Sequence, residues 1–375
     1  MSVTHDSGNI ALVESTIERV RLFLTSHPNF VELHEEEHIS KLISYNTLGG
    51  KYFRASTIIN AAQSICEAND QKFDSEQAAI LGVCTEMMHA SFLIEDDVID
   101  QSPTRRGKPT WYKLPDIGLS GINDAFMLEN TVYIVLRHFF KEHILLDRII
   151  SVFQNTIWRT SIGEYIDTKL CYHPNHPSIT ALPTEDDKRE VQQIDLLKKY
   201  LTLENYRNIC RMKTGVYTFF HPFILGCIYG GINLSEEALK SVEDVCLHIG
   251  ILFQAKDDYL DCYGDPAITG KIGTDIEDGK CSWFSSKILS IPCSEEEKAN
   301  ILKTMITHYG RNEPDSVKVI KELYAKFKLS ELFEEYSKKE LEAVNKEIDE
   351  LCSSVKTIPG MVLRNLALMS VNRIK

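Results

Sequence analysis

Apolar residues recur every three or four positions along most of the chain, which is the spacing of helices with one buried face. Helices are predicted at residues 10–25, 58–65, 76–100, 123–141, 145–169, 203–230 and 235–263, with several more from residue 295 onward. No strand-like alternation, repeat or linker is visible in the sequence. The chain is therefore predicted to be all-α, a single domain over residues 1–375 with ten or more helices.

Two stretches interrupt this pattern. Residues 102–119 follow the helix that Pro103 ends, are rich in Arg, Gly, Pro and Trp, and are predicted to form a loop. Residues 172–192 carry prolines and many charges, and we expect a surface loop without function there. Small residues such as Gly82 and Ala90 predict that the helix at 76–100 packs closely against a neighbour.

Composition narrows the class of protein. The 375 residues are 43% hydrophobic and 25% charged, as in globular proteins. The net charge of −13 argues against a nucleic-acid binder and fits a protein that recruits metal cations and then an anionic ligand. The ten cysteines form no C-x-x-C pair, which predicts reduced core thiols in a cytoplasmic protein.

Neither a signal peptide nor a membrane span is expected. The first residues are polar and lack the apolar stretch of a signal peptide. The longest apolar run, residues 219–232, is interrupted by His221, Pro222 and glycines and is too short to cross a bilayer. We expect a soluble protein.

Residues 34–38 read His-Glu-Glu-Glu-His, which matches the H-E-x-x-H pattern of zinc proteases. A zinc site of that kind needs a third ligand and an apolar helix around the two histidines. The surroundings of His34 and His38 are charged and no third ligand is evident. We therefore expect a solvated helix face.

Residues 49–54 read Gly-Gly-Lys-Tyr-Phe-Arg and come just before a predicted helix. Glycine N–H groups, together with the cations Lys51 and Arg54 near a helix N-terminus, suit an anion. The Gly-x4-Gly-Lys-Ser/Thr spacing of a P-loop is absent. The stretch is either a phosphate site or a turn with surface charges.

Two acidic boxes of the form Asp-Asp-x-x-Asp stand about 160 residues apart: Asp96, Asp97 and Asp100, then Asp257, Asp258 and Asp261. On a helix, the three carboxylates of one box lie within roughly 100° of one face. Each box is either a solvated helix end or a site for cations. Oxygen ligands favour Mg²⁺, which shares its coordination with substrate phosphates. Two facing boxes would hold Mg²⁺ ions that bridge a diphosphate while a C–O bond breaks.

Cations accompany both boxes: Arg105 and Arg106 after the first, Lys213 with Thr214 between them, Lys271 and Lys280 after the second. Arginine suits bidentate phosphate contacts and lysine acts as a point charge. No nucleophile motif such as G-x-S-x-G is visible. The chemistry predicted is electrostatic, with a diphosphate leaving and a cation stabilised.

These motifs in this order resemble the trans-isoprenyl diphosphate synthases, the farnesyl/geranylgeranyl diphosphate synthase family. The resemblance covers nearly the whole chain and is greatest to a eukaryotic farnesyl-type scaffold. It rests on residues 49–54, Glu86-Met87-Met88-His89, the first box with residues 105–111, Lys213-Thr214, the second box with Phe253-Gln254, and residues 264–276.

The resemblance implies a helical fold around a deep cavity, a homodimer, and three Mg²⁺ ions per active site. The implied metal residues are Asp96, Asp100 and Asp257, supported by Asp97, Asp258 and Asp261. Those implied for the allylic diphosphate are Arg105, Lys213, Gln254 and Lys271, with Lys280 nearby. Those implied for isopentenyl diphosphate are Lys51, Arg54, His89 and Arg106, closed over by a tail with Arg373 and Lys375.

The resemblance also implies a mechanism. Metal-assisted loss of diphosphate leaves an allylic cation, which carbonyls and hydroxyls near Lys213, Thr214 and Tyr217 stabilise. The double bond of isopentenyl diphosphate attacks, and the departing diphosphate takes the proton. Catalytic roles therefore fall to Asp96, Asp257, Lys213 and Thr214.

Three features depart from the farnesyl-type pattern. His89 and Glu164 stand where glutamines are usual; longer-chain members often have the histidine, and Glu164 places a carboxylate near the reactive carbon. Ser91 and Phe92 occupy the floor of the chain-length pocket, where short-chain enzymes carry aromatics. Serine in place of a Phe-sized group frees room for roughly one more isoprene unit. We expect geranylgeranyl diphosphate as main or co-product, with farnesyl diphosphate as the alternative.

Two other functions stay open. A terpene synthase built on this scaffold would ionise a prenyl diphosphate without isopentenyl diphosphate. Lys51, Arg54 and Arg106 argue against it, because they would lose their ligand. The second is a non-catalytic partner subunit of another synthase, which the two intact boxes disfavour.

Overall fold

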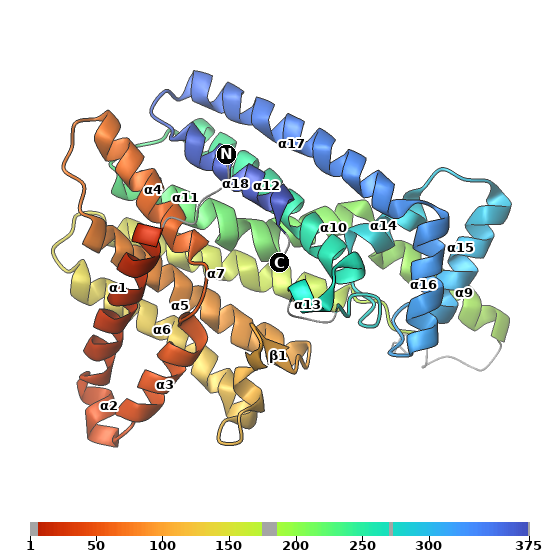
Figure 1. Ribbon diagram of the computed structural model, residues 1–375, viewed down its shortest axis with the longest axis horizontal. Helices are drawn as coiled ribbons and strands as arrows, with labels where there is room; N and C mark the ends of the chain where they lie inside the picture. The colour runs from red at the N-terminus through yellow and green to blue at the C-terminus, as the bar shows by residue number, and fades with distance from the viewer. Residues whose placement is uncertain (1–6, 175–185, 270–272, 374–375) are drawn as a thin grey trace. The chain divides into compact units, whose positions relative to one another are not determined.

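The computed structural model describes residues 7–174, 186–269 and 273–373, and its regular structure is almost entirely helical (Figure 1). The prediction of an all-α protein is confirmed. The chain forms two compact units, each assembled from three stretches. Unit 1 comprises residues 1–158, 217–244 and 348–365, and unit 2 comprises residues 159–216, 245–347 and 366–375.

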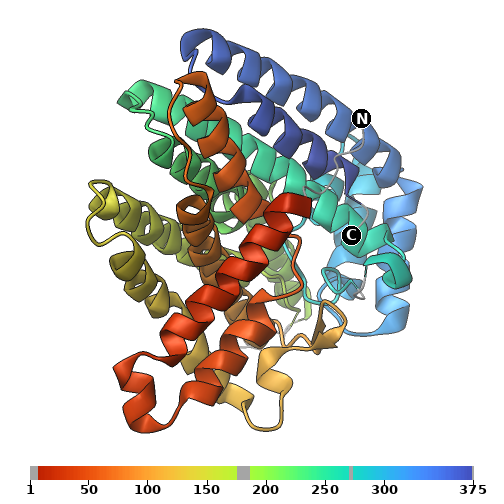
Figure 2. The same cartoon turned by 60° about the vertical axis from the view of Figure 1, so that its left-hand side comes forward.

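Unit 1 is organised around α5 (Ser75–Ile99), which packs against α1, α3, α4, α6 and α11. Its other elements are α1 (Ser7–Thr25), α2 (Pro28–Leu33), α3 (Glu36–Thr47), α4 (Phe53–Ala68), β1 (Thr104–Arg105), β2 (Lys108–Pro109), the 3-10 turns η1 (Trp111–Lys113) and η2 (Gly118–Ser120), α6 (Gly121–Phe139) and α11 (His221–Tyr229). Both views show α1 alongside α3 (Figures 1 and 2).

Helix α5 is the core helix of unit 1. Asp74 caps it by accepting a hydrogen bond from the Gln77 N–H at 3.0 Å. A Cβ on Gly82 would lie 2.8 Å from the Cβ of Ala55, so the close packing predicted here is confirmed against α4. By length and composition α5 could cross a membrane, but 83% of its apolar window is buried inside the structure. This burial is the behaviour of a core helix.

Unit 2 contains α9 (Asp186–Tyr200), α10 (Leu203–Ile209), α13 (Pro266–Thr269), α14 (Trp283–Ser290), α15 (Glu295–His308) and α16 (Pro314–Lys326). Helix α15 lies beside α16. Capping boxes at Ser282 and Ser294 begin α14 and α15. Stretches of both units occur in α7 (Leu146–Lys169), η3 (Cys210–Phe220), α12 (Glu236–Tyr263), α17 (Leu329–Ser354) and α18 (Gly360–Asn372).

The helix predicted at residues 203–230 is found at residues 203–229, but it is not α-helical throughout. Helix α10 ends at Ile209, the π-helical segment η3 follows, and α11 begins at His221. Pro222 stands in the first turn of α11 and has no N–H to donate, so a regular ladder of hydrogen bonds cannot run through it. A π-helical stretch inside a helix frequently marks a functional site.

The surface loop predicted at residues 172–192 is wrong at both ends. Tyr172 is fully buried, and its N–H donates to the Gly279 carbonyl at 2.7 Å. Helix α9 already begins at Asp186. Residues 175–185 lie outside the described part of the chain.

The predicted loop at 102–119 contains a small hairpin. Thr104 pairs with Pro109 and Arg105 with Lys108. The two turn residues, Arg106 and Gly107, have φ of 52° and 74°. This two-residue turn with both φ values positive matches the twist of paired strands. Strands of two residues are too short to show alternation in a sequence.

Candidate active site

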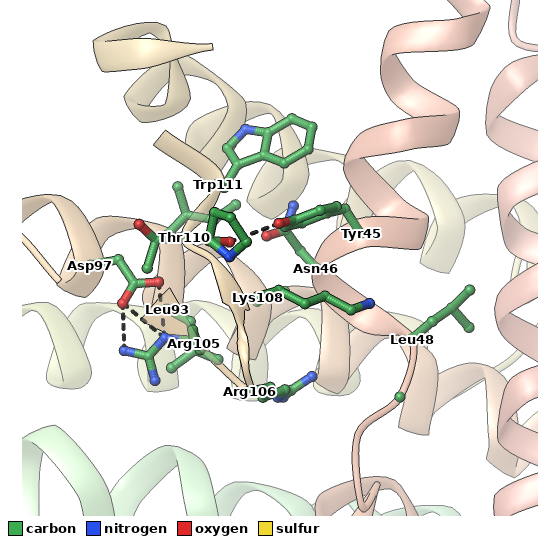
Figure 3. Close-up of a pocket in the computed structure, with 14 residues that line it drawn as sticks. Tyr45, Asn46, Leu48, Leu93, Asp97, Arg105, Arg106, Lys108, Thr110 and Trp111 are labelled. Carbon is green, nitrogen blue, oxygen red and sulfur yellow. Dashed lines mark hydrogen bonds and ion pairs between the residues drawn. The ribbon is translucent and has the colours of Figure 1, made fainter. Parts of the chain in front are cut away.

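In unit 1, the carboxylates at the end of α5 meet an arginine from the hairpin (Figure 3). Arg105 Nε lies 2.9 Å from both carboxylate oxygens of Asp97, and Arg105 Nη2 lies 3.0 Å from Asp96 Oδ2. Asp97 is 3% exposed. Burial raises the pKa of Asp97, and the charge and hydrogen bonds of Arg105 oppose that rise. Asp97 is therefore an inner, charge-paired member of its box.

Asp96 and Asp100 differ from Asp97 because both are only half-buried. Carboxylates at one helix end that solvent can still reach suit Mg²⁺, which retains several waters. Among residues 7–174, 186–269 and 273–373, no three His, Cys, Asp or Glu side chains already converge as a metal site. The metal roles of Asp96, Asp97, Asp100, Asp257 and Asp261 stay predictions.

A second cationic cluster in unit 1 joins α4, α5 and η3. The Arg54 guanidinium lies 4.5 Å from the ring centre of Phe53 and 4.7 Å from that of Tyr217, and Nη2 donates to Thr218 Oγ1 at 2.9 Å. The His89 ring stacks on Tyr217 with 5.5 Å between centres. The structure thus brings together Arg54 and His89, which lie 35 residues apart in the sequence.

Two polar atoms of this cluster, Arg54 Nε and His89 Nδ1, are buried and have no hydrogen-bond partner within the described residues. Burial, and then the charges of Arg54, Arg106 and Arg105, hold the pKa of His89 well below its usual value. The imidazole is therefore neutral. Buried polar atoms without partners carry a free-energy cost, which a bound anionic or polar ligand would relieve.

A pocket of about 120 Å³ lies between α3, α5 and the hairpin of unit 1. Arg105, Arg106 and Lys108 contribute its cations, and Tyr45 and Trp111 line it as well. Figure 3 shows Arg105 turned toward Asp97 and Arg106 turned away from it. The adjacent arginines therefore point their charges in different directions.

Lys51 precedes α4 and is exposed.

Of the two residues expected to set chain length, Ser91 is buried in unit 1 and Phe92 packs against its core. Ser91 is fully buried, and its hydroxyl donates to the Met88 carbonyl at 2.8 Å. Phe92 is half-buried and meets Tyr217 edge-on, with ring centres 5.4 Å apart. Tyr217 therefore contacts Phe92 as well as His89 and Arg54.

In unit 2, two lysines share one buried carboxylate. Lys213 Nζ lies 2.7 Å from Asp167 Oδ2, and Lys280 Nζ lies 3.2 Å from the same oxygen. Lys213 also pairs with Glu164 at 3.0 Å. A Cβ on Gly163 would overlap the Lys213 backbone, so glycine permits this approach of α7 to η3. Burial would raise the pKa of Asp167, but the lysines hold it below its usual value.

A second network in unit 2 links η3, α12 and α14. Thr214 Oγ1 donates to Gln254 Oε1 at 2.7 Å, and Gln254 Nε2 donates to Asp258 Oδ1 at 2.9 Å. The Trp283 N–H donates to Asp258 Oδ2 at 2.8 Å. Burial raises the pKa of Asp258 to about 7, against the opposing effect of these two donors.

The other carboxylates of the second box have partners too. Asp257 Oδ1 pairs with Arg373 Nη2 at 3.2 Å. Asp261 accepts hydrogen bonds from the N–H groups of Thr274 and Asp275. Lys271 and Lys375, which we expected near substrate, lie outside the described residues.

The H-E-x-x-H match serves a structural purpose. His34 follows the end of α2 while His38 lies within α3, so the two histidines do not share one helix. His38 Nε2 lies 2.7 Å from Asp124 Oδ1, and Trp111 Nε1 donates to Asp124 Oδ2 at 2.7 Å. His38 is thus a half-buried link to α6, and the expectation of a solvated face is wrong for this residue.

Sequence reasoning missed the role of Asp167. Its only signal was the pair Glu164 and Asp167, three residues apart and so on one face of a predicted helix. The cations that meet them, Lys213 and Lys280, come from segments far along the chain.

Known proteins resemble this chain over most of its length. The family model described as polyprenyl synthetase matches residues 36–327. A farnesyl diphosphate synthase of Dictyostelium discoideum is 34% identical over 306 residues, covering 80% of this chain and 73% of that protein. A farnesyl pyrophosphate synthase of Saccharomyces cerevisiae is 36% identical over 315 residues, covering 82% of each. The solved structure of a T. brucei farnesyl diphosphate synthase complexed with a bisphosphonate gives a TM-score of 0.83 at 26% identity, covering 98% of this chain and 100% of that one.

The match over residues 36–327 includes both acidic boxes and every candidate cation from Lys51 to Lys280. The relatives and the solved structure extend the likeness to the helical fold as a whole. The chain therefore belongs to the polyprenyl synthetase family.

Proposed function

We propose that the protein is a Mg²⁺-dependent prenyltransferase that condenses isopentenyl diphosphate with dimethylallyl, geranyl or farnesyl diphosphate. One observation carries the proposal: a partly exposed carboxylate at the end of α5, Asp96, is paired with Arg105 of the hairpin at 3.0 Å. A metal–diphosphate site needs both kinds of group. Relatives named farnesyl diphosphate synthase support the same reaction.

Each charged group has a place in this proposal. Bound Mg²⁺ would neutralise the charge that builds on the leaving diphosphate. The residues proposed to hold it are Asp96, Asp100 and Asp257, with Asp97 and Asp261 in support. The residues proposed for the allylic diphosphate are Arg105, Lys213, Gln254, Lys271 and Lys280. The residues proposed for isopentenyl diphosphate are Lys51, Arg54, His89 and Arg106.

The proposed reaction needs no side-chain nucleophile. The C–O bond of the allylic diphosphate breaks, and both electrons leave with the diphosphate. The double bond of isopentenyl diphosphate then supplies the electrons of the new C–C bond. A proton is lost to the departing diphosphate, and a new double bond forms. Neutral His89 is suited to hold a phosphate through one N–H without adding another charge among three arginines.

We propose geranylgeranyl diphosphate as main or co-product and farnesyl diphosphate as the alternative. The named relatives favour the C15 product. The small, fully buried Ser91 on the helix that leads to the first box favours the longer one. A phenylalanine at this position would fill space that a fourth isoprene unit needs.

We further propose that the protein works as a homodimer in the cytoplasm. All ten cysteines are free thiols, and eight of them are buried. Such thiols suit a reducing compartment.

Product chromatography with labelled isopentenyl diphosphate and C5, C10 and C15 primers tests the function. We expect chain growth that stops when the metal is chelated and resumes when Mg²⁺ is returned. Primer ionisation without isopentenyl incorporation would instead indicate a terpene synthase. A complete lack of turnover would indicate a non-catalytic subunit.

The same assay tests product length. Wild-type enzyme is expected to release C20 product, and Ser91→Phe is expected to shift the product to C15. Arrest of the wild-type enzyme at C15 from every primer would refute the role given to Ser91.

A further inference from the structure

A continuous chain of hydrogen bonds in unit 2 runs from Thr214 through Gln254 and Asp258 to the backbone of Trp283. Its three links measure 2.7, 2.9 and 2.8 Å. Thr214 and Asp258, the two ends of its side-chain part, are 6% and 4% exposed. Buried bonds of this length hold their groups in one arrangement.

The chemistry of the groups determines the direction of every bond in this chain. The Trp283 N–H can only donate, and the ionised carboxylate of Asp258, the form present at pH 8, can only accept. The Gln254 amide must therefore turn its NH₂ toward Asp258 and its carbonyl oxygen toward the other side. That carbonyl oxygen can only accept, so the Thr214 hydroxyl uses its single hydrogen to donate a hydrogen bond to Gln254.

Committing this proton leaves Thr214 Oγ1 with only lone pairs to offer to its other neighbours. When the C–O bond of an allylic diphosphate breaks, both electrons leave with the diphosphate and positive charge develops on the allylic carbon. An oxygen lone pair aimed at that carbon stabilises the charge, and a hydroxyl proton aimed at it would oppose the charge. Fixed dipoles directed at developing charge are among the largest contributions to catalysis.

We propose that Asp258 is a positioning residue that acts through Gln254 to hold the Thr214 hydroxyl with its lone pairs toward the allylic cation. This inference rests on the proposed prenyltransferase function, in which Thr214 lies beside that cation. No proton moves along the chain. The role differs from metal support, which the family resemblance assigned to Asp258: both of its carboxylate oxygens already accept hydrogen bonds.

Asp258→Asn reverses the direction of the two hydrogen bonds between side chains but keeps their number. The Trp283 N–H still needs an acceptor, so the new amide turns its oxygen there and its NH₂ toward Gln254. Gln254 then flips, and its NH₂ donates to Thr214 Oγ1. The rate of a single turnover at saturating geranyl and isopentenyl diphosphate is expected to fall on the order of 10–100-fold. The KM for isopentenyl diphosphate and the unfolding midpoint at pH 8 should stay close to wild type.

A double-mutant cycle with Thr214→Val separates this role from any other. Valine has nearly the shape of threonine but no hydroxyl, so the chain has nothing left to orient. We expect Thr214→Val to slow turnover about as much as Asp258→Asn, and Asp258→Asn to cause no further loss in the Thr214→Val background. Thr214→Ser keeps the hydroxyl and should turn over faster than Thr214→Val, and Asp258→Asn should still slow turnover in the Thr214→Ser background. If the rate losses of Thr214→Val and Asp258→Asn multiplied in the double variant, Asp258 would act independently of Thr214, and the inference would be overturned.

A second substitution that compensates for Asp258→Asn should restore activity, and a loss of structure cannot explain such a gain. In Asp258→Asn/Gln254→Glu, the introduced amide donates to the introduced carboxylate, whose second oxygen again accepts from Thr214. The pair should recover at least about tenfold of the rate lost in Asp258→Asn. Gln254→Glu alone places two carboxylates together and should be the slowest variant. Failure of the pair to exceed Asp258→Asn would overturn the inference.

These outcomes are distinct from failure of the function itself. A wild-type protein that incorporates no isopentenyl diphosphate overturns the proposed function. If the wild-type enzyme is active and Asp258→Asn turns over at the same rate, only the positioning role of Asp258 is overturned.

Discussion

The two acidic boxes have the same sequence pattern, but their buried second carboxylates are held by different chemistry. Asp97 in unit 1 forms an ion pair with Arg105, whereas Asp258 in unit 2 accepts from an amide and a backbone N–H. Burial raises the pKa of both carboxyls. A cation opposes the rise at Asp97, while at Asp258 only neutral hydrogen bonds do.

This difference shows that a motif specifies residue types without specifying the work of each residue. The ion pair at Asp97 fixes the hairpin to the end of α5, and with it the position of both arginines. The neutral network at Asp258 fixes the direction of a hydroxyl. We therefore expect Asp97→Asn to lower mainly the stability, and Asp258→Asn to lower mainly the rate of turnover.

The largest effect should come from the first aspartate of each box. Asp96→Asn and Asp257→Asn should each lower kcat on the order of 10³-fold, because each removes a charge proposed to hold the metal. Steady-state turnover at saturating Mg²⁺ measures this. Glu95→Gln on the same helix is the matched control and should leave kcat nearly unchanged. An equal loss at Glu95 would show that the total charge of the helix end matters, not a ligand position.

The second aspartates should separate stability from turnover. At pH 8, Asp97→Asn removes one charge from an ion pair whose arginine is 34% exposed and should cost about 1–3 kcal/mol of unfolding free energy. Asp258→Asn keeps the number of hydrogen bonds and should cost less than about 1 kcal/mol. Urea unfolding of the two variants measures both values. A large loss of stability in Asp258→Asn would remove the contrast between the boxes.

Helix positions were predictable because they depend on local periodicity. Residues 76–100 were expected to form the helix observed at Ser75–Ile99, and residues 145–169 the helix observed at Leu146–Lys169. The π-helical segment could not be found this way, because its apolar spacing resembles that of an α-helix. The hairpin was missed because its pairing covers only two residues on each side.

The candidate site was predictable in residue identity and not in connections. The Arg105–Asp97 pair spans eight residues and was within reach of local reasoning. The bonds from Thr214 to Gln254 and from Lys213 to Asp167 span 40 and 46 residues, and they join different helices. Such pairings depend on tertiary packing, and local patterns in a single sequence do not reveal which distant segments meet.

The pH dependence of stability offers a further way to distinguish the boxes. The pKa of Asp258 is raised from an ordinary 3.8 to about 7, so the folded state binds a proton more tightly than the unfolded state. Its stabilising contribution is complete below about pH 4 and is lost as pH rises through about 7. Between pH 5 and pH 8, wild type should lose about 2–3 kcal/mol of unfolding free energy relative to Asp258→Asn, which lacks this group. Urea unfolding at the two pH values in metal-free buffer measures the difference, and a difference that does not change with pH would contradict the raised pKa.

The smallest effect concerns the cation that each unit shares between two carboxylates. Arg105 is shared by Asp96 and Asp97, and Lys213 is shared by Glu164 and Asp167. If Lys213 holds the allylic diphosphate, Glu164 competes with substrate for its charge. Glu164→Gln should therefore lower the KM for the allylic substrate about 2–5-fold, consistent with a partly exposed pair worth under about 1 kcal/mol. Initial rates at varied geranyl diphosphate measure this.

The KM for isopentenyl diphosphate should not change in this variant, because Lys213, the partner of Glu164, is proposed to bind the allylic diphosphate. Asp147→Asn, an exposed carboxylate at the start of the same helix, is the matched control and should change neither constant. A rise in the allylic KM would mean that the Glu164 charge assists binding. The carboxylate would then act like the first aspartates of the boxes, and Lys213 would no longer be the counterpart of Arg105.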